Sequence, residues 1–263
     1  MRFYVVMIFV LSISINSIFS QVTNEFPRFY TIHKTEKPPI IDGKISTNEW
    51  KNLSWSESFV DIADSIHVIP PFETRFNMMW DDQYIYIAAS LKEKDIWATL
   101  THHDDIIYRD HDFEVFIDPN NDGEQYFEIE INAFNAVMDL FMNKPYKKKG
   151  IYNLNWDAQG LITAIKINGT INNNQDIDTG WTIEMAIPFD CMKREGRIYH
   201  PKAGSTWRIN FSRVEWPLEK KDTYYQKAKD IYGKNKAEKN WVWSRIGISD
   251  MHIPEKWGYL YFK

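Results

Sequence analysis

Hydrophobic and polar residues alternate along much of the chain, in short runs separated by turn-forming residues. Residues 126–132 (Tyr-Phe-Glu-Ile-Glu-Ile-Asn) alternate strictly, and residues 207–212 alternate in the same way. A period of two places every second side chain on one face, which is the pattern of a half-buried β-strand. The pattern predicts nine strands, at residues 74–80, 84–91, 112–117, 126–131, 136–141, 161–167, 181–187, 206–214 and 258–262.

Turn signals between these runs predict antiparallel hairpins, for example at Asp81-Asp82-Gln83 and at Asn120-Asn121-Asp122-Gly123. Helical signals are few. The capping-box spacing of Ser46 and Glu49 ahead of Trp50 predicts one short helix. A second helical turn is predicted at residues 224–228, inside a charged excursion at residues 217–240. Many short strands with one or two short helices predict an all-β fold, a jelly-roll-like antiparallel β-sandwich.

The first twenty residues have the pattern of a secretory signal peptide. Arg2 precedes an apolar run at residues 3–11, and the small residue Ser20 stands before Gln21. The run is too short to span a bilayer, and no other apolar stretch approaches that length. We therefore expect residues 1–20 to be cleaved and the mature chain to be secreted or periplasmic, without a membrane span. An uncleaved anchor is the alternative.

The remaining chain shows neither an internal repeat nor a linker. We predict a lead-in at residues 21–35 and a single domain at residues 36–263, and we expect a monomer. Among the 263 residues, 44% are hydrophobic and 25% are charged, which is typical of a globular protein. Cys191 is the only cysteine, so no intrachain disulfide can form and the domain must be stabilised by its core.

Charge and aromatic content limit the classes of ligand that the chain can be expected to bind. Lys and Arg number 31 against 36 Asp and Glu, so the chain lacks the positive field that nucleic-acid binding requires. Aromatic residues make up 16% of the chain, more than the core pattern alone explains. Several of them stand in polar, loop-like surroundings, where an aromatic ring can stack on a ligand.

The sequence contains none of the common catalytic motifs. A phosphate-binding glycine loop, a nucleophile elbow and a His-Glu-x-x-His helix are all absent. A glycoside hydrolase or lyase remains an alternative, because such enzymes need only a pair of carboxylates, here from among Asp112, Glu128 and Glu130.

Two metal-based alternatives have weaker signals. A haem-binding β-sandwich redox module would need axial ligands, for which the nominal candidates are Met78, Met79, Met138 and His102. A zinc site would draw on the nearest approach to a histidine cluster, His102, His103 and His111, which lacks His-x-His spacing.

A tight acidic turn offers oxygen ligands for a cation. Asp118, Asn120 and Asp122 alternate ahead of Gly123, as in the first half of a calcium-binding loop. The twelfth position is Ile129 rather than glutamate, so the turn is not an EF-hand. It either binds Ca²⁺ with ligands from other loops or is an Asx-rich hairpin turn.

Seven motifs, in order along the chain, resemble the carbohydrate-binding module family 9 and its wider group of exported family-9-like proteins. They are Ile40-Ile41-Asp42-Gly43 with Glu49-Trp50, Trp80-Asp81 with Tyr84-Ile85-Tyr86, and residues 112–119, 126–132, 180–188, 207–213 and 251–258. The resemblance covers residues 36–263. It implies a β-sandwich of the carbohydrate-binding-module type with structural calcium. The best-known members bind the reducing end of a glycan between two tryptophans.

The resemblance also places the candidate sugar site. Counting back from residues 113–118 puts the first clamp position on Tyr108, and counting back from Pro254 puts the second near Met251 or His252. Polar sugar contacts fall on the strand that carries Glu128, Glu130 and Asn132. A second aromatic wall could come from Trp97 or from a tryptophan at residues 241–243.

The leading hypothesis is an exported, non-catalytic carbohydrate-binding protein. Its ligand would be an oligo- or polysaccharide, bound by aromatic stacking and by hydrogen bonds to carboxylates and amides. We expect it to act in polysaccharide breakdown beside polysaccharide-degrading enzymes.

Overall fold

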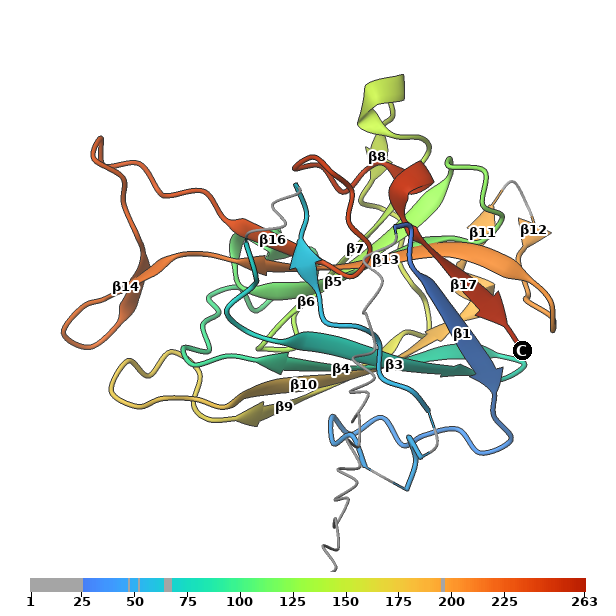
Figure 1. Ribbon diagram of the computed structural model, residues 1–263, viewed down its shortest axis with the longest axis horizontal. Helices are drawn as coiled ribbons and strands as arrows, with labels where there is room; N and C mark the ends of the chain where they lie inside the picture. The colour runs from blue at the N-terminus through green and yellow to red at the C-terminus, as the bar shows by residue number, and fades with distance from the viewer. Residues whose placement is uncertain (1–25, 47, 52, 64–67, 195–196) are drawn as a thin grey trace, which may run out of the picture.

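A computed structural model describes residues 26–263, apart from residues 47, 52, 64–67 and 195–196 (Figure 1). The predicted signal peptide lies outside the described residues. The strands are β1 (Phe29–Lys34), β2 (Val60–Asp61), β3 (Thr74–Trp80), β4 (Tyr84–Lys92), β5 (Asp112–Asp118), β6 (Tyr126–Asn132), β7 (Val137–Met142), β8 (Tyr152–Asn153), β9 (Ile162–Asn168), β10 (Gly180–Pro188), β11 (Lys193–Arg194), β12 (Arg197–Ile198), β13 (Thr206–Glu215), β14 (Leu218–Lys220), β15 (Tyr225–Lys227), β16 (Lys239–Val242) and β17 (Gly258–Phe262). The short 3₁₀ helices are η1 (Ile107–Arg109), η2 (Tyr146–Lys148), η3 (Phe189–Cys191) and η4 (Pro254–Lys256). The predicted all-β fold is confirmed.

Two sheets share strand β1 and curl around a common core (Figure 1). One sheet has the order β8-β7-β6-β5-β13-β17-β1, with β16 paired to β13 and β2 paired to β16. The other has the order β1-β3-β4-β10-β9. Strand β1 is parallel to both of its neighbours, β17 and β3, whereas the other strand pairs described are antiparallel.

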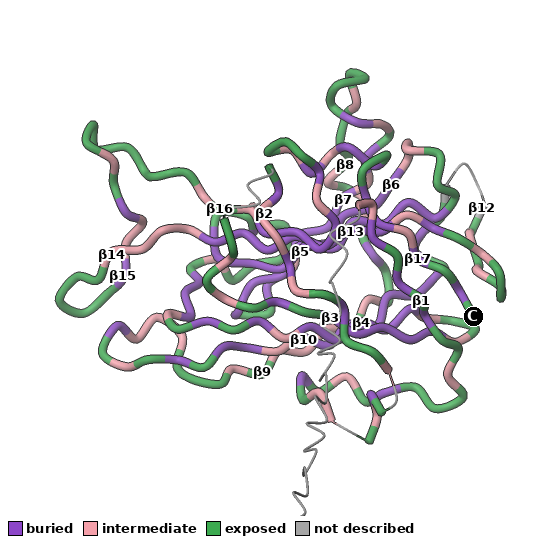
Figure 2. Tube along the Cα trace, viewed as in Figure 1, coloured by how far each residue is buried: buried purple, intermediate pink, exposed green. Residues whose placement is uncertain are grey.

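The core lies between the sheets and is built from every second residue of the long strands. Phe113, Val115 and Ile117 of β5 face Ile85 and Ile87 of β4 within one cluster of buried side chains. Aromatic rings fill its centre, and the rings of Phe76 and Phe211 lie 4.0 Å apart. Burying one such side chain contributes about 1.5–3 kcal/mol. The purple strands and green loops of Figure 2 show this division between core and surface.

Strand β1 extends the domain into the segment predicted as a lead-in. Tyr30 and Ile32 are buried, while Phe29 and Thr31 are exposed, so the strand alternates like the others. Its first four residues pair with β17, and its last two pair with β3. Residues 29–34 therefore join the two sheets and belong to the sandwich.

Both predicted helices are wrong. Near Ser46 the chain makes a single turn, in which the N–H of Trp50 donates to the Ser46 carbonyl over 3.1 Å. The turn does not continue because the Trp50 indole is held by Glu184 of β10. Residues 225–227 form strand β15, because the buried Tyr225 donates its hydroxyl to Asp95 across 2.7 Å and fixes the segment as a hairpin with β14.

A buried carboxylate fastens this turn to the second sheet. One oxygen of Glu184 accepts the N–H groups of Asp42 and Gly43, and the other accepts the Trp50 indole N–H over 2.8 Å. Gly43 has a φ of +78°, and a Cβ there would lie 2.6 Å from the Ile165 carbonyl carbon. Only glycine fits this close approach of two backbones.

Candidate functional site

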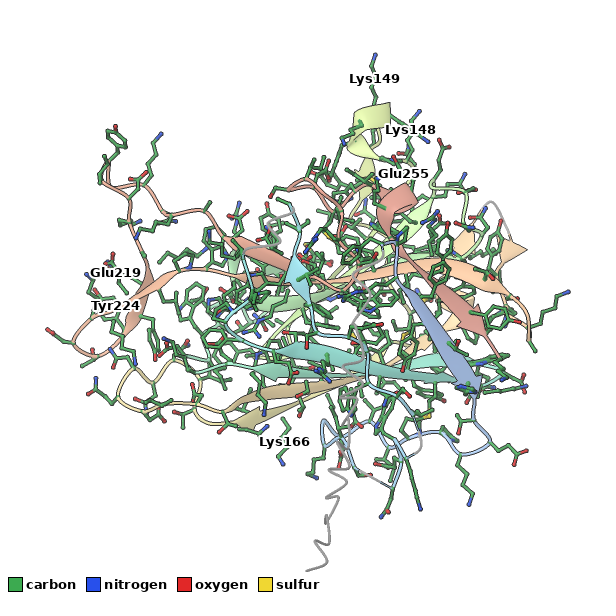
Figure 3. All side chains as sticks on the ribbon, in the orientation of Figure 1. Lys148, Lys149, Lys166, Glu219, Tyr224 and Glu255 are labelled. Carbon is green, nitrogen blue, oxygen red and sulfur yellow. The ribbon has the colours of Figure 1, made fainter. Side chains whose placement is uncertain are left out.

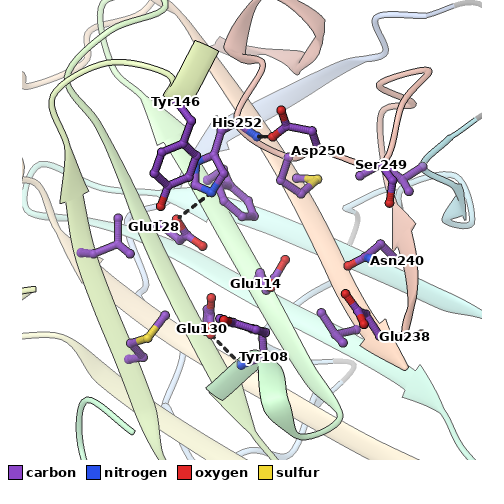
Figure 4. Close-up of a pocket in the computed structure, with 16 residues that line it drawn as sticks. Tyr108, Glu114, Glu128, Glu130, Tyr146, Glu238, Asn240, Ser249, Asp250 and His252 are labelled. Carbon is purple, nitrogen blue, oxygen red and sulfur yellow. Dashed lines mark hydrogen bonds and ion pairs between the residues drawn. The ribbon is translucent and has the colours of Figure 1, made fainter. Parts of the chain in front are cut away.

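A pocket opens on the face of the larger sheet that points away from the core (Figure 4). Along β5, Phe113 and Val115 enter the core, so Glu114 and Phe116 project from the opposite face. The cavity has a volume of about 250 Å³. The residues lining it are Ile62, Tyr108, Glu114, Phe116, Glu128, Glu130, Met138, Leu140, Tyr146, Val214, Glu238, Asn240, Ser249, Asp250, Met251 and His252.

Three buried glutamates form the floor of the pocket. The pairing of β5 with β6 sets Glu114 directly opposite Glu130. Glu128 precedes Glu130 by two residues in β6, so both side chains lie on the same face of the sheet. Burial disfavours the charged form, which raises the pKa of Glu114 to about 7 and that of Glu128 to about 8. Burial and the neighbouring carboxylates raise the pKa of Glu130 well above its usual range. No lysine or arginine lines the described part of this pocket.

Two half-exposed tyrosines flank the carboxylates. Tyr108 lies in η1 and Tyr146 in η2, with exposed fractions of 43% and 45%. The Tyr108 N–H donates to Glu130 Oε2 over 2.8 Å, and its carbonyl accepts the Trp216 indole N–H over 2.9 Å. The Tyr146 ring meets His252 edge-on, with centroids 4.5 Å apart. In Figure 4 the tyrosines stand on opposite sides of the three glutamates.

His252 closes one side of the pocket in a fixed orientation. Its Nδ1 shares a hydrogen bond of 2.8 Å with the Tyr126 hydroxyl, and its backbone N–H donates to Asp250 over 2.9 Å. Burial lowers the pKa of His252 to about 4, so the imidazole is neutral near pH 7. Its Nε2 lies 3.9 Å from Oε2 of Glu128, which has no hydrogen-bond partner among the described residues. A buried acceptor without a partner is ready for a ligand donor.

The structure brings most of the predicted site residues together. Tyr108, Glu128, Glu130, Met251 and His252 all line this one pocket, although they come from three separate parts of the chain.

The other predicted contacts lie elsewhere. The Asn132 amide donates to the Leu100 carbonyl, and its oxygen accepts the N–H groups of Phe134 and Ala136, so this side chain holds the turn between β6 and β7. Trp97 is buried against His111 outside the pocket. Trp241 and Trp243 belong to the core, because alternation along β16 and the segment after it turns both rings inward. None of these tryptophans lines the pocket, and the second half-exposed aromatic ring that does is Tyr146.

Sequence reasoning also missed several pocket residues. Glu114 had a usable signal, because it lies two residues before Phe116 in an alternating strand and directly across from Glu130. Tyr146 had none, because it stands in a lysine-rich segment without periodicity. Asn240 reaches the pocket from the short strand β16, and Glu238 and Asp250 reach it from segments outside the strands.

The acidic turn after β5 is ordered by its own hydrogen bonds. The buried Asp118 carboxylate accepts the N–H groups of Asn121 and Gly123, and Asp122 accepts that of Glu124. The side chains of Asp118, Asn120 and Asp122 gather oxygen donors at one tight turn, and oxygen donors suit a hard cation such as Ca²⁺. Calcium binding there stays a prediction.

The residues named as nominal haem ligands do not assemble into a site. Met78 lies in the main core between the sheets and Met138 in the cluster beneath the pocket, so the nominal haem ligands face different sides of a sheet. Burial raises the pKa of the Cys191 thiol to about 12, which leaves it unreactive. Within the described residues, no helix is both long and apolar enough to cross a membrane.

A pocket with aromatic sides and a floor of hydrogen-bond acceptors, carried on a β-sandwich, defines a module of the carbohydrate-binding class. The chain belongs to the family described as carbohydrate family 9 binding domain-like, which matches residues 41–211. The resemblance found in the sequence is thereby confirmed.

Two curated relatives align with about half of the chain. Endo-1,4-beta-xylanase A of Thermoanaerobacterium saccharolyticum is 26% identical over 152 residues, or 57% of this chain and 11% of the xylanase. Exoglucanase XynX of Acetivibrio thermocellus is 25% identical over 152 residues, or 57% of this chain and 12% of the exoglucanase. The chain matches only about a tenth of the length of these relatives.

Solved structures share the fold at low identity. A family 9 carbohydrate binding module from Caldicellulosiruptor kristjanssonii, in complex with glucose, has a TM-score of 0.53 at 17% identity, covering 89% of this chain and 96% of the module. The same module with cellotriose has a TM-score of 0.54 at 17% identity, covering 89% and 94%. A protein from Bacteroides uniformis reaches 0.65 at 15% identity, covering 90% and 99%.

Proposed function

We propose that the pocket binds a terminal sugar of a polysaccharide or oligosaccharide and that the protein is a non-catalytic carbohydrate-binding module. The observation that carries the proposal is the unpartnered, buried Oε2 of Glu128 between two half-exposed tyrosines. A sugar ring has an apolar C–H face that can lie on Tyr108 or Tyr146. Its hydroxyl groups can donate to Glu128 and Glu114.

The dimensions of the pocket favour a chain end. Pockets for drug-sized ligands measure about 300–1,000 Å³, and this one measures about 250 Å³. A cavity of this size accommodates one or two sugar units, whereas a chain bound along its length would need an open groove. In support, a structurally similar family 9 module has been solved with glucose and with cellotriose.

The protonation pattern favours binding over catalysis. A glycosidase needs one carboxyl with a raised pKa and a partner that stays ionised. Here the pKa values of Glu114, Glu128 and Glu130 all move upward for the same reason, burial. Release of reducing sugar from a panel of polysaccharides, abolished in Glu114→Gln and Glu128→Gln, would instead assign a hydrolase.

The cellular setting is part of the proposal. We infer export from the signal-peptide pattern of residues 1–20 and a role beside polysaccharide-degrading enzymes from the xylanase and exoglucanase relatives. We also infer a structural Ca²⁺ ion at Asp118, Asn120 and Asp122 from the donor set of that turn.

Isothermal titration with glucose, cello-oligosaccharides and xylo-oligosaccharides tests the proposed function. We expect saturable binding to at least one ligand, lost in Tyr108→Ala. Tyr224→Ala is the matched control, because this tyrosine is also exposed, at 55% against 43% for Tyr108, but lies on the β14–β15 hairpin at the edge of the molecule (Figure 3). The absence of heat with every sugar, or equal loss in both variants, would refute the proposal.

A further inference from the structure

A second cluster of ligating side chains lies on the opposite side of the larger sheet from the pocket. His103 Nε2 is 3.6 Å from an oxygen of Asp104 and 3.9 Å from an oxygen of Asp157. His103, Asp104 and Asp139 each place one ligating atom within 4.8 Å of the other two. Two ligands of one tetrahedral zinc ion are about 3.3–3.6 Å apart, since each lies about 2.0–2.2 Å from the metal. The cluster therefore needs only small side-chain movements to surround one ion.

The backbone already orients the histidine as a ligand. Nδ1 of His103 lies 3.0 Å from the carbonyl oxygen of Val137, which can accept only a hydrogen bond, so Nδ1 carries the proton. The free lone pair is consequently on Nε2, the atom that faces the carboxylates. A histidine whose second nitrogen is bonded to a carbonyl is the usual arrangement at metal sites. The N–H of Asp104 donates to the same carbonyl over 2.9 Å and holds the loop in place.

Asp139 gives a second observation in favour of a bound cation, independent of the histidine geometry. Its side chain is 1% exposed, and its Oδ1 has no hydrogen-bond partner among the described residues. Its Oδ2 accepts the Ala158 N–H over 3.2 Å. Burial raises the pKa of this carboxyl to about 6, and the electrostatic influence of His103 opposes that rise. A divalent cation at the cluster would give the buried oxygen a partner and stabilise its charge.

The cluster is separate from the sugar pocket. Met138 and Leu140 of β7 line the pocket, and Asp139 between them points to the other face, opposite Ile129 of the core. His103 and Asp157 are each more than half exposed at their side chains, so the cluster is open to solvent.

We propose that His103, Asp104, Asp139 and Asp157 bind one divalent transition-metal ion, with a donor set of one imidazole nitrogen and three carboxylate oxygens. An imidazole with carboxylates suits Zn²⁺ better than Ca²⁺, which takes oxygen ligands. The ion would join the loop before η1 to β7 and to the segment at residues 156–159, so it is a structural site.

The test uses protein freed of its affinity tag and dialysed against EDTA, titrated with ZnCl₂, MnCl₂ or CaCl₂ by calorimetry. We expect one saturable Zn²⁺ site, a rise in melting temperature with Zn²⁺, and at least a tenfold loss of affinity in His103→Ala and in Asp139→Asn. His102→Ala is the matched control, because His102 is the adjacent, exposed histidine and lies outside the cluster. This control should bind Zn²⁺ as the wild type does.

Cobalt substitution adds a readout that does not depend on stability. Co²⁺ at this site should give visible absorption bands that disappear in His103→Ala, a surface variant that we expect to fold normally. Failure of Zn²⁺ to bind, or equal binding by His103→Ala and the wild type, would overturn the proposal. Tighter binding of Ca²⁺ than of Zn²⁺ would overturn the assignment of the metal.

Discussion

Glu128 and His252 face each other across the pocket, with Oε2 and Nε2 3.9 Å apart, too far for a direct hydrogen bond. Tyr126 fixes the other nitrogen of the imidazole, so the ring cannot approach the carboxylate without breaking that bond. A ligand hydroxyl placed between the two side chains could bond to both. The gap between Glu128 and His252 is therefore where we expect the sugar to be recognised.

Glu128→Gln should weaken sugar binding at pH 9, above the carboxyl pKa of about 8. A hydrogen bond to a charged acceptor contributes about 1.5–3 kcal/mol, so we expect the Kd to rise roughly 10- to 100-fold. Calorimetric titration with the best ligand of the panel measures this change. An unaltered Kd would remove Glu128 from the binding site.

Tyr146→Ala should weaken binding as much as Tyr108→Ala does, because the two rings flank the pocket with nearly equal exposure. Loss of a stacking partner costs about 1–3 kcal/mol. Phenylalanine at either position keeps the ring and should retain most of the affinity. If Tyr146→Ala binds sugar as the wild type does while Tyr108→Ala does not, the sugar stacks on Tyr108 alone.

The stability of the protein should fall as the pH rises from 7 to 8. The pKa of Glu128 is higher in the folded protein than in the unfolded chain, so the folded state binds more protons and loses stability as protons are removed. One such group contributes at most about 1.4 kcal/mol per pH unit. His252 does not contribute in this range, because its lowered pKa leaves it neutral in the folded state and it is mostly neutral when unfolded.

Denaturant unfolding of the wild type and of Glu128→Gln at both pH values checks this prediction. Glu93 also has a raised pKa, of about 8. It contributes to the pH dependence of stability in both proteins, so its effect cancels when the two pH dependences are compared. The variant should show the shallower pH dependence. Equal slopes would mean that Glu128 is ionised in the folded protein well below pH 8.

Glu184→Ala should lower the free energy of unfolding by roughly 2–5 kcal/mol. The substitution removes the acceptor for Asp42, Gly43 and the Trp50 indole, and each buried donor left unpaired costs about 1–3 kcal/mol. Glu184→Gln keeps one acceptor oxygen and should cost less. Sugar binding at the remote pocket should be unchanged, which separates this structural role from function.

Calcium should raise the melting temperature of the EDTA-treated protein. A ligand that binds only the folded state stabilises it by about 2.7 kcal/mol at a concentration of 100 Kd. Asp122→Asn retains an Asx turn but removes a charge from the acidic turn, so its response to Ca²⁺ should be smaller. A melting curve that does not respond to CaCl₂ would contradict the calcium proposal.

The fold was predictable because strand periodicity is a local property. The nine predicted strands correspond to β3, β4, β5, β6, β7, β9, β10, β13 and β17, and no bound differs by more than one residue. The helix at Ser46 was mispredicted although its capping contact does form, with the Glu49 N–H donating to the Ser46 hydroxyl over 3.3 Å. The Trp50 indole of the same turn bonds instead to Glu184 of β10, and the described residues around it form no helix. The residues around Ser46 carry no information about this bond, because Glu184 lies 134 residues after Trp50 in the sequence.

The site was predictable where it lies on an alternating strand and, for Tyr108, Met251 and His252, where the family resemblance placed a residue. Glu128 and Glu130 followed from alternation, whereas Tyr146 and Asp250 come from loops whose paths are set by packing. The same limit applies to the metal cluster. His103 and Asp104 are adjacent in sequence, but Asp139 and Asp157 reach them only through the position of β7 and of the segment that covers it.

The parallel placement of β1 between β17 and β3 bears on the order in which the domain forms. Residue 29 finds its partner at residue 259, so the larger sheet cannot receive β1 until nearly all of the sequence that follows it is present. Contacts this distant slow folding, because loop closure must precede any gain from pairing. Hairpins within each sheet join neighbouring parts of the chain, whereas the junction of the two sheets at β1 depends on the distant strand β17. We therefore expect β1 to pair late, after the hairpins of both sheets have formed.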